Sequence, residues 1–407
     1  ELWAVPSGSY RTVTGTGFAT VEPALLKVEQ NNTSIVYGDR AILKLFRRLE
    51  PGINPELDAG FFLSEKARFE HVPHFAGALE YRHDGETMTV GVLQGFVPNQ
   101  GDAWKFTVDA LSGYYEAAVT IREKVPEPPR IEPISLALLE TDIPAEARDL
   151  IGAYLESAKL LGRRTAELHQ AFASNSADPN FAPEPFTDFY RQSLYHGMLG
   201  QAGRSLTLLR QRLKQLNEPA LSDARRVLAL EPEIRKRFQL VRDRRIDSER
   251  IRCHGDYSLD QVLYTGKDFY ILDFEGDPSR PISERRMKRS PLRDVASMMR
   301  SFFYAAHSVL FGVVPGVLTR PEDWPVLEQW ARYWNRWVAL AFLREYLAAT
   351  GPARFLPQSR ESLGIMLLTY VLDRTMNELD RELTFRPDWV RIPLHGILQL
   401  METPWLQ

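Results

Sequence analysis

Side chains that can hold a metal ion or accept a proton are concentrated between residues 251 and 276. They are Asp256, Gln261 and Asp273. A turn signal at 265–268 separates two short apolar runs, which predicts a hairpin that brings these side chains together. Magnesium-dependent phosphoryl transfer needs such a set, because one acid accepts a hydroxyl proton while another acid and an amide oxygen hold the metal. Oxygen ligands also suit Mg²⁺, which takes few ligands from protein.

A solvated strand end is the simpler interpretation of Asp273 and of Glu275, two residues further on. It does not explain why the apolar run 269–272 would deliver two acids to the same place as Asp256. The tripeptide of His254, Gly255 and Asp256 is a weak signal alone, because such a sequence can mark an ordinary turn. The prediction therefore depends on the complete hairpin.

The elements before this hairpin are expected to form a small sheet with one helix. Strands are expected at 24–28, 34–37, 41–46, 76–81 and 88–96. Asn31 with Asn32, and Gly38 with Asp39, separate the first three runs and are hairpin signals, so the sheet should be antiparallel. Apolar positions at helical spacing in 55–69 predict a helix that packs on the sheet.

Most of the remaining chain is expected to be helical. The helical stretches are predicted at 104–124, 145–173, 185–215, 219–245 and from 292 onward. Residues 125–144 hold five prolines, which remove amide donors and clash with the preceding turn of a helix. We expect this segment to be an excursion on the surface.

The composition favours a small-molecule partner in a reducing compartment. Of 407 residues, 50 are Lys or Arg and 53 are Asp or Glu, so the net charge of −3 gives no reason to bind nucleic acid or an anionic membrane. Cys253 is the only cysteine, which excludes an intrachain disulfide framework and fits the cytoplasm. No apolar run approaches the roughly 20 residues that cross a bilayer. The first residues have neither an initiator Met nor a signal pattern, so a piece of a longer polypeptide is expected.

The catalytic segment resembles that of maltokinases and other aminoglycoside-phosphotransferase-like proteins, which share the protein-kinase fold. The resemblance is carried by His254, Gly255 and Asp256, by Gln261 where protein kinases have Asn, and by Asp273 and Glu275. Residues 30–48 are similar to the maltokinase nucleotide lobe, and residues 379–394 to the end of these proteins. The resemblance implies an α+β fold, with a nucleotide-binding lobe of antiparallel sheet plus helix over 1–100 and a larger helical lobe over 101–407.

The same resemblance implies a nucleotide site for ATP. Lys44 would reach the phosphates, with Glu56 as its acidic partner and Asp58 or Glu65 as alternatives. An ordinary strand lysine with an extended stem is the alternative for Lys44. Further nucleotide contacts are expected from Asn32, Thr33, Ser34, Gln94 and Phe96.

The roles at the reacting centre follow from the resemblance in the same way. Asp256 would accept the proton of the acceptor hydroxyl. The ligands of Mg²⁺ would be Gln261 and Asp273, with Glu275 assisting. His254 and Asp294 are expected to support the catalytic loop structurally rather than to react.

The acceptor is implied to be a sugar. In the family this is maltose, phosphorylated on its anomeric hydroxyl for α-glucan (glycogen) synthesis, and some members are fused to trehalose synthase. The positions that would contact the sugar are Arg374, Asn377 and Arg381, where the family usually has lysine and tyrosines. This difference leaves open another acceptor, such as glucosamine or an aminoglycoside, and a non-catalytic kinase-like appendage of trehalose synthase is a further alternative. The N-terminal cap of maltokinases is not recognisable in residues 1–29, so the cap was removed or is lacking.

Two groups of residues have an ordinary structural interpretation that we prefer. The tryptophans 324, 330, 334 and 337 could form a platform for a sugar ring, but aromatic residues at helical spacing are more often buried packing. The basic run of Arg285, Arg286, Lys288 and Arg289 could bind phosphate, but such a run is usually a solvated face.

Overall fold

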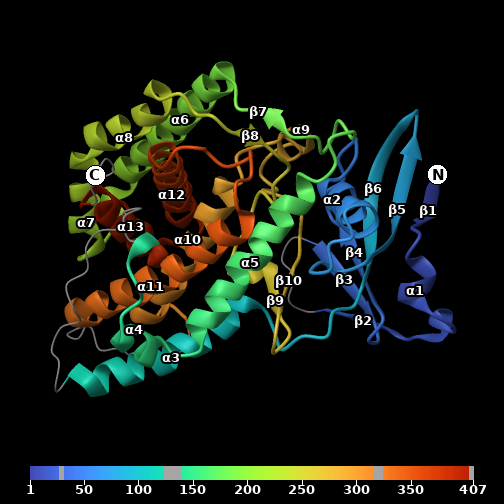
Figure 1. Cartoon of the computed structure of the whole chain (residues 1–407), viewed down its shortest axis with the longest axis horizontal. Helices are drawn as coiled ribbons and strands as arrows, with labels where there is room; N and C mark the ends of the chain where they lie inside the picture. The colour runs from blue at the N-terminus through green and yellow to red at the C-terminus, as the bar shows by residue number, and fades with distance from the viewer. Residues whose placement is uncertain (27–31, 123–138, 315–323, 403–407) are drawn as a thin grey trace. The chain divides into compact units, whose positions relative to one another are not determined.

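The protein is described from a computed structural model that covers residues 1–26, 32–122, 139–314 and 324–402 (Figure 1). By compactness, these residues form two units. The first contains Glu1–Ala103, Glu167–Pro183 and Ile251–Arg289, and the second contains Trp104–Ala166, Glu184–Arg250 and the chain from Ser290 onward. The segment with the predicted hairpin therefore groups with the N-terminal sheet. The predicted lobe division at residue 100 stays a prediction.

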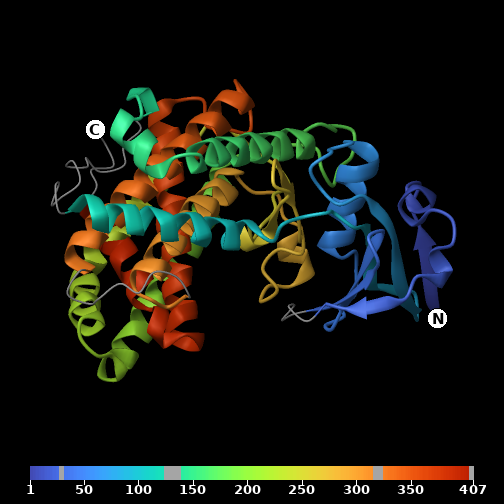
Figure 2. The same cartoon turned by 90° about the horizontal axis from the view of Figure 1, so that it is seen from below.

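An antiparallel sheet, drawn in shades of blue in Figure 2, organises the first unit. Its described strands run in the order β1-β5-β6-β4-β3-β2. The strands are β1 (Leu2–Pro6), β2 (Pro23–Leu25), β3 (Asn32–Tyr37), β4 (Ala41–Phe46), β5 (Phe75–His83) and β6 (Glu86–Gly95). Asp84 and Gly85 both have positive φ, which a tight hairpin turn between β5 and β6 requires. All neighbouring strands pair antiparallel, as predicted. The end of the predicted strand 24–28 and Asn31 lie outside the described residues.

The strand that carries Lys44 approaches its neighbour β6 closely. Leu45 pairs with Gly91, and a Cβ added at Gly91 would lie 2.6 Å from the backbone oxygen of Lys44. Real Cβ atoms do not come so near, so glycine is required at this position for β4 and β6 to pair as they do.

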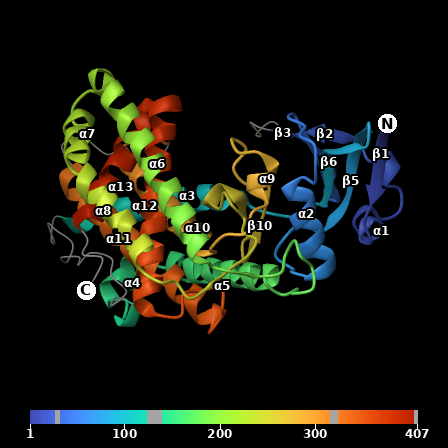
Figure 3. The same cartoon turned by 90° about the horizontal axis from the view of Figure 1, so that it is seen from above.

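Helix α2 (Pro55–Phe61) packs on the sheet (Figure 3). Asn54 caps it, because its side chain accepts a hydrogen bond of 2.8 Å from the Glu56 amide, and Pro55 suits the first helical position. Leu57 packs against a buried cluster of Phe46, Phe75, Ala78 and Val92. The helix continues as a π-helical turn over Phe62–Lys66, so the predicted helix at 55–69 is shorter and less regular than expected.

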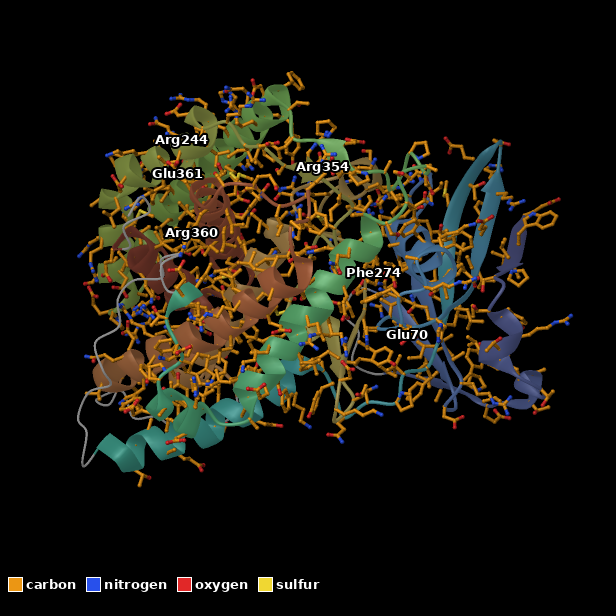
Figure 4. All side chains as sticks on the ribbon, in the orientation of Figure 1. Glu70, Arg244, Phe274, Arg354, Arg360 and Glu361 are labelled. Carbon is orange, nitrogen blue, oxygen red and sulfur yellow. The ribbon has the colours of Figure 1, made fainter. Side chains whose placement is uncertain are left out.

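The predicted hairpin is present. Strands β9 (Val262–Tyr264) and β10 (Phe269–Ile271) pair antiparallel, with Phe269 opposite Tyr264 and Ile271 opposite Val262. Phe274, labelled in Figure 4, follows β10 and is buried; its ring centroid lies 6.0 Å from that of Phe172 and 5.0 Å from that of His254. The remaining helices of this unit are α1 (Tyr10–Thr14) and α9 (Ile282–Arg285).

The second unit is mainly helical, as predicted. Its helices are α3 (Ala103–Arg122), α4 (Ala145–Ile151), α5 (Tyr154–Phe172), α6 (Asp188–Arg212), α7 (Ala220–Ala229), α8 (Glu231–Asp243), α10 (Leu292–Leu310), α11 (Trp324–Thr350), α12 (Arg360–Phe385) and α13 (Arg391–Glu402). The last residues of α5, from Glu167, belong to the first unit. Helix α12 packs against α6, α8, α10 and α13. The short strands β7 (Glu184–Pro185) and β8 (Glu249–Arg250) pair with each other. No helix among the described residues is long and apolar enough to cross a membrane.

Some predicted helices are divided. The stretch 145–173 is two helices, because α4 ends at Gly152, whose φ of +64° a continuing helix cannot adopt. Residues 219–245 are likewise α7 and α8. Most of the proline-rich segment 125–144 lies outside the described residues. Of the tryptophans on α11, Trp330, Trp334 and Trp337 are buried, which supports packing rather than a sugar platform.

A buried histidine links three helices of the second unit. His395 of α13 lies 2.9 Å from Asp223 of α7 through Nε2 and 3.0 Å from Glu328 of α11 through Nδ1. Burial would lower the pKa of His395, but the hydrogen bonds and charges of these two carboxylates outweigh it and raise the pKa. The protonated ring can donate to both acids, so it ties α7 and α11 to α13.

Candidate active site

Lys44 is held between the two acids that follow β10. Its Nζ lies 2.7 Å from Asp273 Oδ1 and 2.7 Å from Glu275 Oε1. Asn32 of β3 donates to the same Glu275 oxygen at 2.5 Å. Lys44 is buried, whereas the Asp273 side chain is 36% exposed. The neighbouring strands β3 and β4 therefore meet a segment some 230 residues further along the chain at Glu275.

The charges in this cluster stabilise one another. Burial alone would lower the pKa of Lys44, but the attraction of Asp273, Glu56 and Glu275 raises it well above its usual value. Burial would likewise raise the pKa of Asp273, yet the charge of Lys44 lowers it. The lysine is thus a cation and Asp273 an anion over the whole physiological range.

Glu56, the predicted acidic partner of Lys44, makes its hydrogen bond elsewhere. Its Oε1 accepts from Gln94 Nε2 at 2.8 Å, while its buried Oε2 has no hydrogen-bond partner. Burial raises the pKa of Glu56 to about 7, although the charge of Lys44 opposes that shift. The two alternatives are engaged with other groups, since Asp58 pairs with Arg252 and Glu65 accepts from Ser9. Of the three acids, Glu56 is the one whose charge acts on Lys44.

The catalytic loop lies against the end of the hairpin. His254 Nε2 is 2.7 Å from the Leu272 oxygen, and the Leu272 amide donates to the Gln261 oxygen at 2.9 Å. A Cβ added at Gly255 would lie 3.5 Å from Gly276 Cα, so Asp256 begins beside the segment that holds Asp273. The structural role expected for His254 stays a prediction.

Asp273 has an unusual backbone conformation. Its φ is +61°, a left-handed conformation that residues other than glycine rarely adopt. Strained residues of this kind cluster at functional sites, because the surrounding structure must hold them in place. The conformation turns the chain directly after β10, where Asp273 meets Lys44.

The expected nucleotide contacts lie on β3 and at the end of β6. Thr33 Oγ1 accepts from Arg47 Nε at 3.1 Å, and Ser34 is buried. The Phe96 amide donates to the Arg40 oxygen at 2.8 Å, so this backbone donor is already used within the unit. The roles of these residues in nucleotide binding stay predictions.

The acids and the amide fit a magnesium ion by their chemistry. Asp273 and Glu275 supply carboxylate oxygens, and the backbone oxygen of Gln261 accepts from the amide of Leu272, the residue before Asp273. Within the described part of the chain, no group of three or more His, Cys, Asp or Glu side chains could hold a metal. Mg²⁺ keeps several water molecules and often takes only one or two carboxylates, so a smaller set is sufficient for it.

The basic run after the hairpin is not a solvated face, and that prediction is wrong. Arg285 pairs with Glu50 at 2.8 Å, and its side chain is only 5% exposed. Arg286 pairs with Asp58, and the buried Lys288 donates to the Pro179 oxygen at 2.7 Å. Charge patterning missed these contacts because every partner comes from a distant part of the chain.

The other predicted residues belong to the second unit. Asp294 is buried near the start of α10, and its predicted supporting role stays a prediction. The expected sugar contacts all lie on α12. Arg374 Nε is 3.6 Å from Glu378, the Asn377 side chain donates to the Asp373 oxygen at 2.7 Å, and Arg381 is exposed. Their role towards the sugar also stays a prediction.

Comparison with known proteins gives distant relatives of one kind. No family model matches the chain. It is 22% identical over 316 residues to the glucosamine kinase of Streptacidiphilus jiangxiensis, covering 76% of this chain and 60% of that protein. It is 24% identical over 297 residues to the glucosamine kinase of Mycolicibacterium smegmatis, covering 69% and 58%. The chain therefore spans less than two thirds of the length of these curated relatives.

Solved structures show the fold. A glucosamine kinase crystal structure superimposes with a TM-score of 0.68 at 19% identity, covering 98% of this chain and 80% of that one. A glucosamine kinase in complex with glucosamine, ADP and inorganic phosphate gives a TM-score of 0.67 at 19% identity, covering 93% and 80%. The chain has a kinase-like fold. This confirms the predicted α+β architecture of an antiparallel sheet with a large helical part.

Proposed function

We propose that this chain is an ATP-dependent kinase that phosphorylates a hydroxyl group of a small sugar. The observation that carries the proposal is Lys44 held between Asp273 and Glu275, with the Asp256 loop packed against the same segment. The distant sequence relatives, both named glucosamine kinases, support a sugar as acceptor. They support the aminoglycoside-phosphotransferase-like superfamily, but not maltokinase specifically.

The proposed reaction transfers the terminal phosphoryl group of ATP. The sugar oxygen forms a bond to the terminal phosphorus, the bond from that phosphorus to the ADP oxygen breaks, and the hydroxyl proton passes to Asp256. Lys44 neutralises phosphate charge, and Asp273, Glu275 and Gln261 would hold Mg²⁺. Held by these side chains, the metal would offset the negative charge of the phosphates. Most catalysis of this type comes from positioning and charge neutralisation.

The ion pairs of Lys44 define what nucleotide binding must change. In this structure Asp273 and Glu275 both pair with the ammonium group of Lys44. The phosphates of ATP would attract the same ammonium group. When the nucleotide binds, Lys44 would pair with phosphate, and Asp273 and Glu275 would be available to hold Mg²⁺. The number of opposite-charge contacts is thereby preserved, so the exchange leaves no buried charge unpaired.

An amino sugar such as glucosamine is the favoured acceptor. Maltose, implied by the resemblance in the sequence, is the competitor, and on α12 Arg374, Asn377 and Arg381 stand where lysine and tyrosines would be expected for it. An association with trehalose synthase belongs to the maltose alternative and depends on it. The acceptor is selected by whether the site offers a hydrogen-bond partner to each hydroxyl and amino group of the sugar. Each buried polar group left without a partner costs about 1–3 kcal/mol of binding free energy.

A coupled assay of ADP formation over a panel of sugars tests the proposal. We expect a higher kcat/KM with glucosamine than with glucose, N-acetylglucosamine, maltose or an aminoglycoside. A higher value with maltose would restore the maltokinase prediction. No phosphorylation of any sugar, despite measurable binding of ATP with Mg²⁺, would contradict the function.

Calorimetry distinguishes the proposed kinase from the non-catalytic alternative. A kinase-like appendage without activity need not bind nucleotide, whereas the proposed enzyme must. Titration of the chain with ATP and Mg²⁺ should release or absorb heat with a stoichiometry near one site per chain. Absence of binding even at high nucleotide concentration would favour the appendage.

A further inference from the structure

Asp58 lies at the meeting point of helix α2 and the catalytic segment. Its Oδ2 accepts from Arg252 at 2.9 Å, from Arg286 Nε at 3.1 Å, and lies 3.0 Å from the second guanidinium nitrogen of Arg286. We refer to Asp58, Arg252 and Arg286 as the Asp58 clamp. One carboxylate oxygen thus binds two arginines that come from opposite ends of the catalytic segment.

Arg252 is buried and is held by contacts of its side chain and of the backbone next to it. Its side chain is 4% exposed, its guanidinium lies 5.2 Å from the centre of the Phe181 ring, and the preceding residue Ile251 exchanges two backbone hydrogen bonds with Arg289. The residue stands four positions before Asp256. A displacement of Arg252 would therefore be transmitted to the loop that carries the proposed base.

Next to Arg286, the side chain of Arg285 contacts the segment that carries Glu275. The neighbouring Arg285 pairs with Glu50 at 2.8 Å and donates to the Glu275 backbone oxygen at 3.3 Å. The segment after Glu275 is consequently attached to the N-terminal part of the first unit by two acids, Glu50 and Asp58. Glu275 in turn contacts Lys44.

Helix α2 links the clamp to Glu56. Residues two positions apart on a helix face different directions, so Asp58 can reach the catalytic segment while Glu56 faces Gln94 and acts on Lys44. Because the helix is only seven residues long, a displacement of Asp58 would be transmitted along it to Glu56.

The clamp depends on its single negative charge. Arg252 and Arg286 repel each other, and the carboxylate of Asp58 is what holds both at one point. Removing one partner of a buried charged group leaves the other charge uncompensated, which costs more than the pair contributes. An uncharged side chain at position 58 would allow the two arginines to separate.

We propose that Asp58 is a positioning residue for the nucleotide site, holding Glu56 and the catalytic segment in register so that Lys44 can exchange its partners for phosphate. The inference deepens the proposed kinase function and rests on it. Asp58 does not touch the nucleotide in this proposal. It acts through α2, and its effect must therefore depend on Glu56.

The test compares Asp58→Asn with a matched control, Glu80→Gln. The control removes a carboxylate that pairs with Arg82 in the same unit, at a more exposed position away from the site. We expect the dissociation constant of ADP with Mg²⁺, measured by calorimetry, to rise about tenfold in Asp58→Asn, the scale of a disturbed coupled network. The control should change it by less than about twofold, because exposed ion pairs contribute little. The KM for the sugar should be unchanged in both variants.

A double-mutant cycle separates positioning from a general loss of stability. In a Glu56→Gln background, Asp58→Asn should add little further loss of nucleotide affinity, since both act through the same element. Fully additive losses would overturn the proposal, as would an unchanged affinity in Asp58→Asn. Should Asp58→Asn fail to fold, Arg286→Gln, at a half-buried position, replaces it in the cycle with the same expected coupling.

The two hypotheses fail in different ways. If no sugar is phosphorylated but nucleotide affinity still shows the Asp58 and Glu56 coupling, the proposed function is wrong and the positioning role stands. If sugar is phosphorylated and the coupling is absent, the kinase function stands and Asp58 is only a structural residue.

Discussion

At the scale of single residues, the site contains four carboxylates, and they stand in different relations to its one lysine. Lys44 contacts Asp273 and Glu275, while Glu56 is buried with one oxygen that makes no hydrogen bond. Asp256 belongs to a different loop, next to Gly276. Charge neutralisation and proton transfer are therefore assigned to separate residues, and substitutions can test them separately.

Asp256→Asn is expected to lower kcat strongly and to leave nucleotide binding nearly intact. General-base catalysis contributes roughly 10²–10⁴-fold, and the amide has the same shape but cannot accept the proton. Single-turnover kinetics and calorimetry with ATP and Mg²⁺ measure the two effects. Near-normal turnover in this variant would remove Asp256 from the mechanism.

Glu56→Gln is expected to flatten the pH dependence of stability. Burial raises the pKa of Glu56 from 4.5 to about 7. A raised pKa means that the folded chain holds the proton of Glu56 more tightly than the unfolded chain does. The protonated Glu56 therefore contributes to the free energy of unfolding fully below pH 4.5, and this contribution is lost as the pH rises through 7. Between these two pH values the free energy of unfolding of the wild type should fall, relative to that of the glutamine variant, by on the order of 2–3 kcal/mol. Urea unfolding of both chains at several pH values checks this, and parallel curves would contradict the assignment.

At the scale of elements, β4, β6, α2 and the β9-β10 hairpin determine where the charges lie. Lys44 is on β4, Glu56 on α2, and Asp273 directly follows the hairpin. Each element is fixed by a local feature, such as the Asn54 cap of α2 or the glycine of β6. Moving one element by a fraction of an ångström would change the ion pairs of Lys44.

Gly91→Ala is expected to destabilise the sheet and weaken nucleotide binding together. The added methyl group would approach the Lys44 backbone oxygen within 2.6 Å, so β4 or β6 must shift. Overpacking of this kind typically costs about 1–3 kcal/mol. Thermal unfolding and calorimetry with ADP and Mg²⁺ measure the two losses.

Gly113→Ala on α3 provides the control for this substitution. Nothing lies within 4 Å of a Cβ added there, and alanine in place of a helical glycine stabilises by about 0.5–1 kcal/mol. An unchanged unfolding midpoint in Gly91→Ala would mean that the close approach of β4 and β6 does not constrain the site.

At the scale of the whole molecule, the residues of the proposed nucleotide site belong to the first unit. The segment Ile251–Arg289 belongs to that unit although most of the helical chain precedes or follows it in sequence. A ligand that binds only the folded first unit should consequently stabilise that unit. The second unit has its own buried core around α10, α11 and α12.

ADP with Mg²⁺ is expected to raise the unfolding temperature of the chain. A ligand at about 100 times its dissociation constant stabilises the folded state by about 2.7 kcal/mol. Mg²⁺ alone should do much less, because Asp273 and Glu275 already pair with Lys44. Differential scanning fluorimetry with each addition, and with EDTA, measures the effect. An equal shift with Mg²⁺ alone would show that the acids bind metal without nucleotide.

The sequence by itself determined the local features. Alternating apolar residues and turn signals predicted the antiparallel strands and the β9-β10 hairpin, because strand formation and turns depend on neighbouring residues. Spacing and resemblance selected Lys44, Asp256, Gln261 and Asp273. The lengths of α2 and the break after α4 were missed, since irregular helix ends depend on packing and on a single backbone angle.

Only the tertiary structure decided which charges meet. It paired Lys44 with Asp273 and Glu275, left Glu56 bound to Gln94, and joined Asp58 to Arg252 and Arg286. The sequence predicted a solvated face for the basic run 285–289, because a run of like charges is usually exposed to water. Electrostatic partners are chosen by distance and burial in space, and residues some 230 positions apart leave no pattern in the sequence that identifies them as a pair.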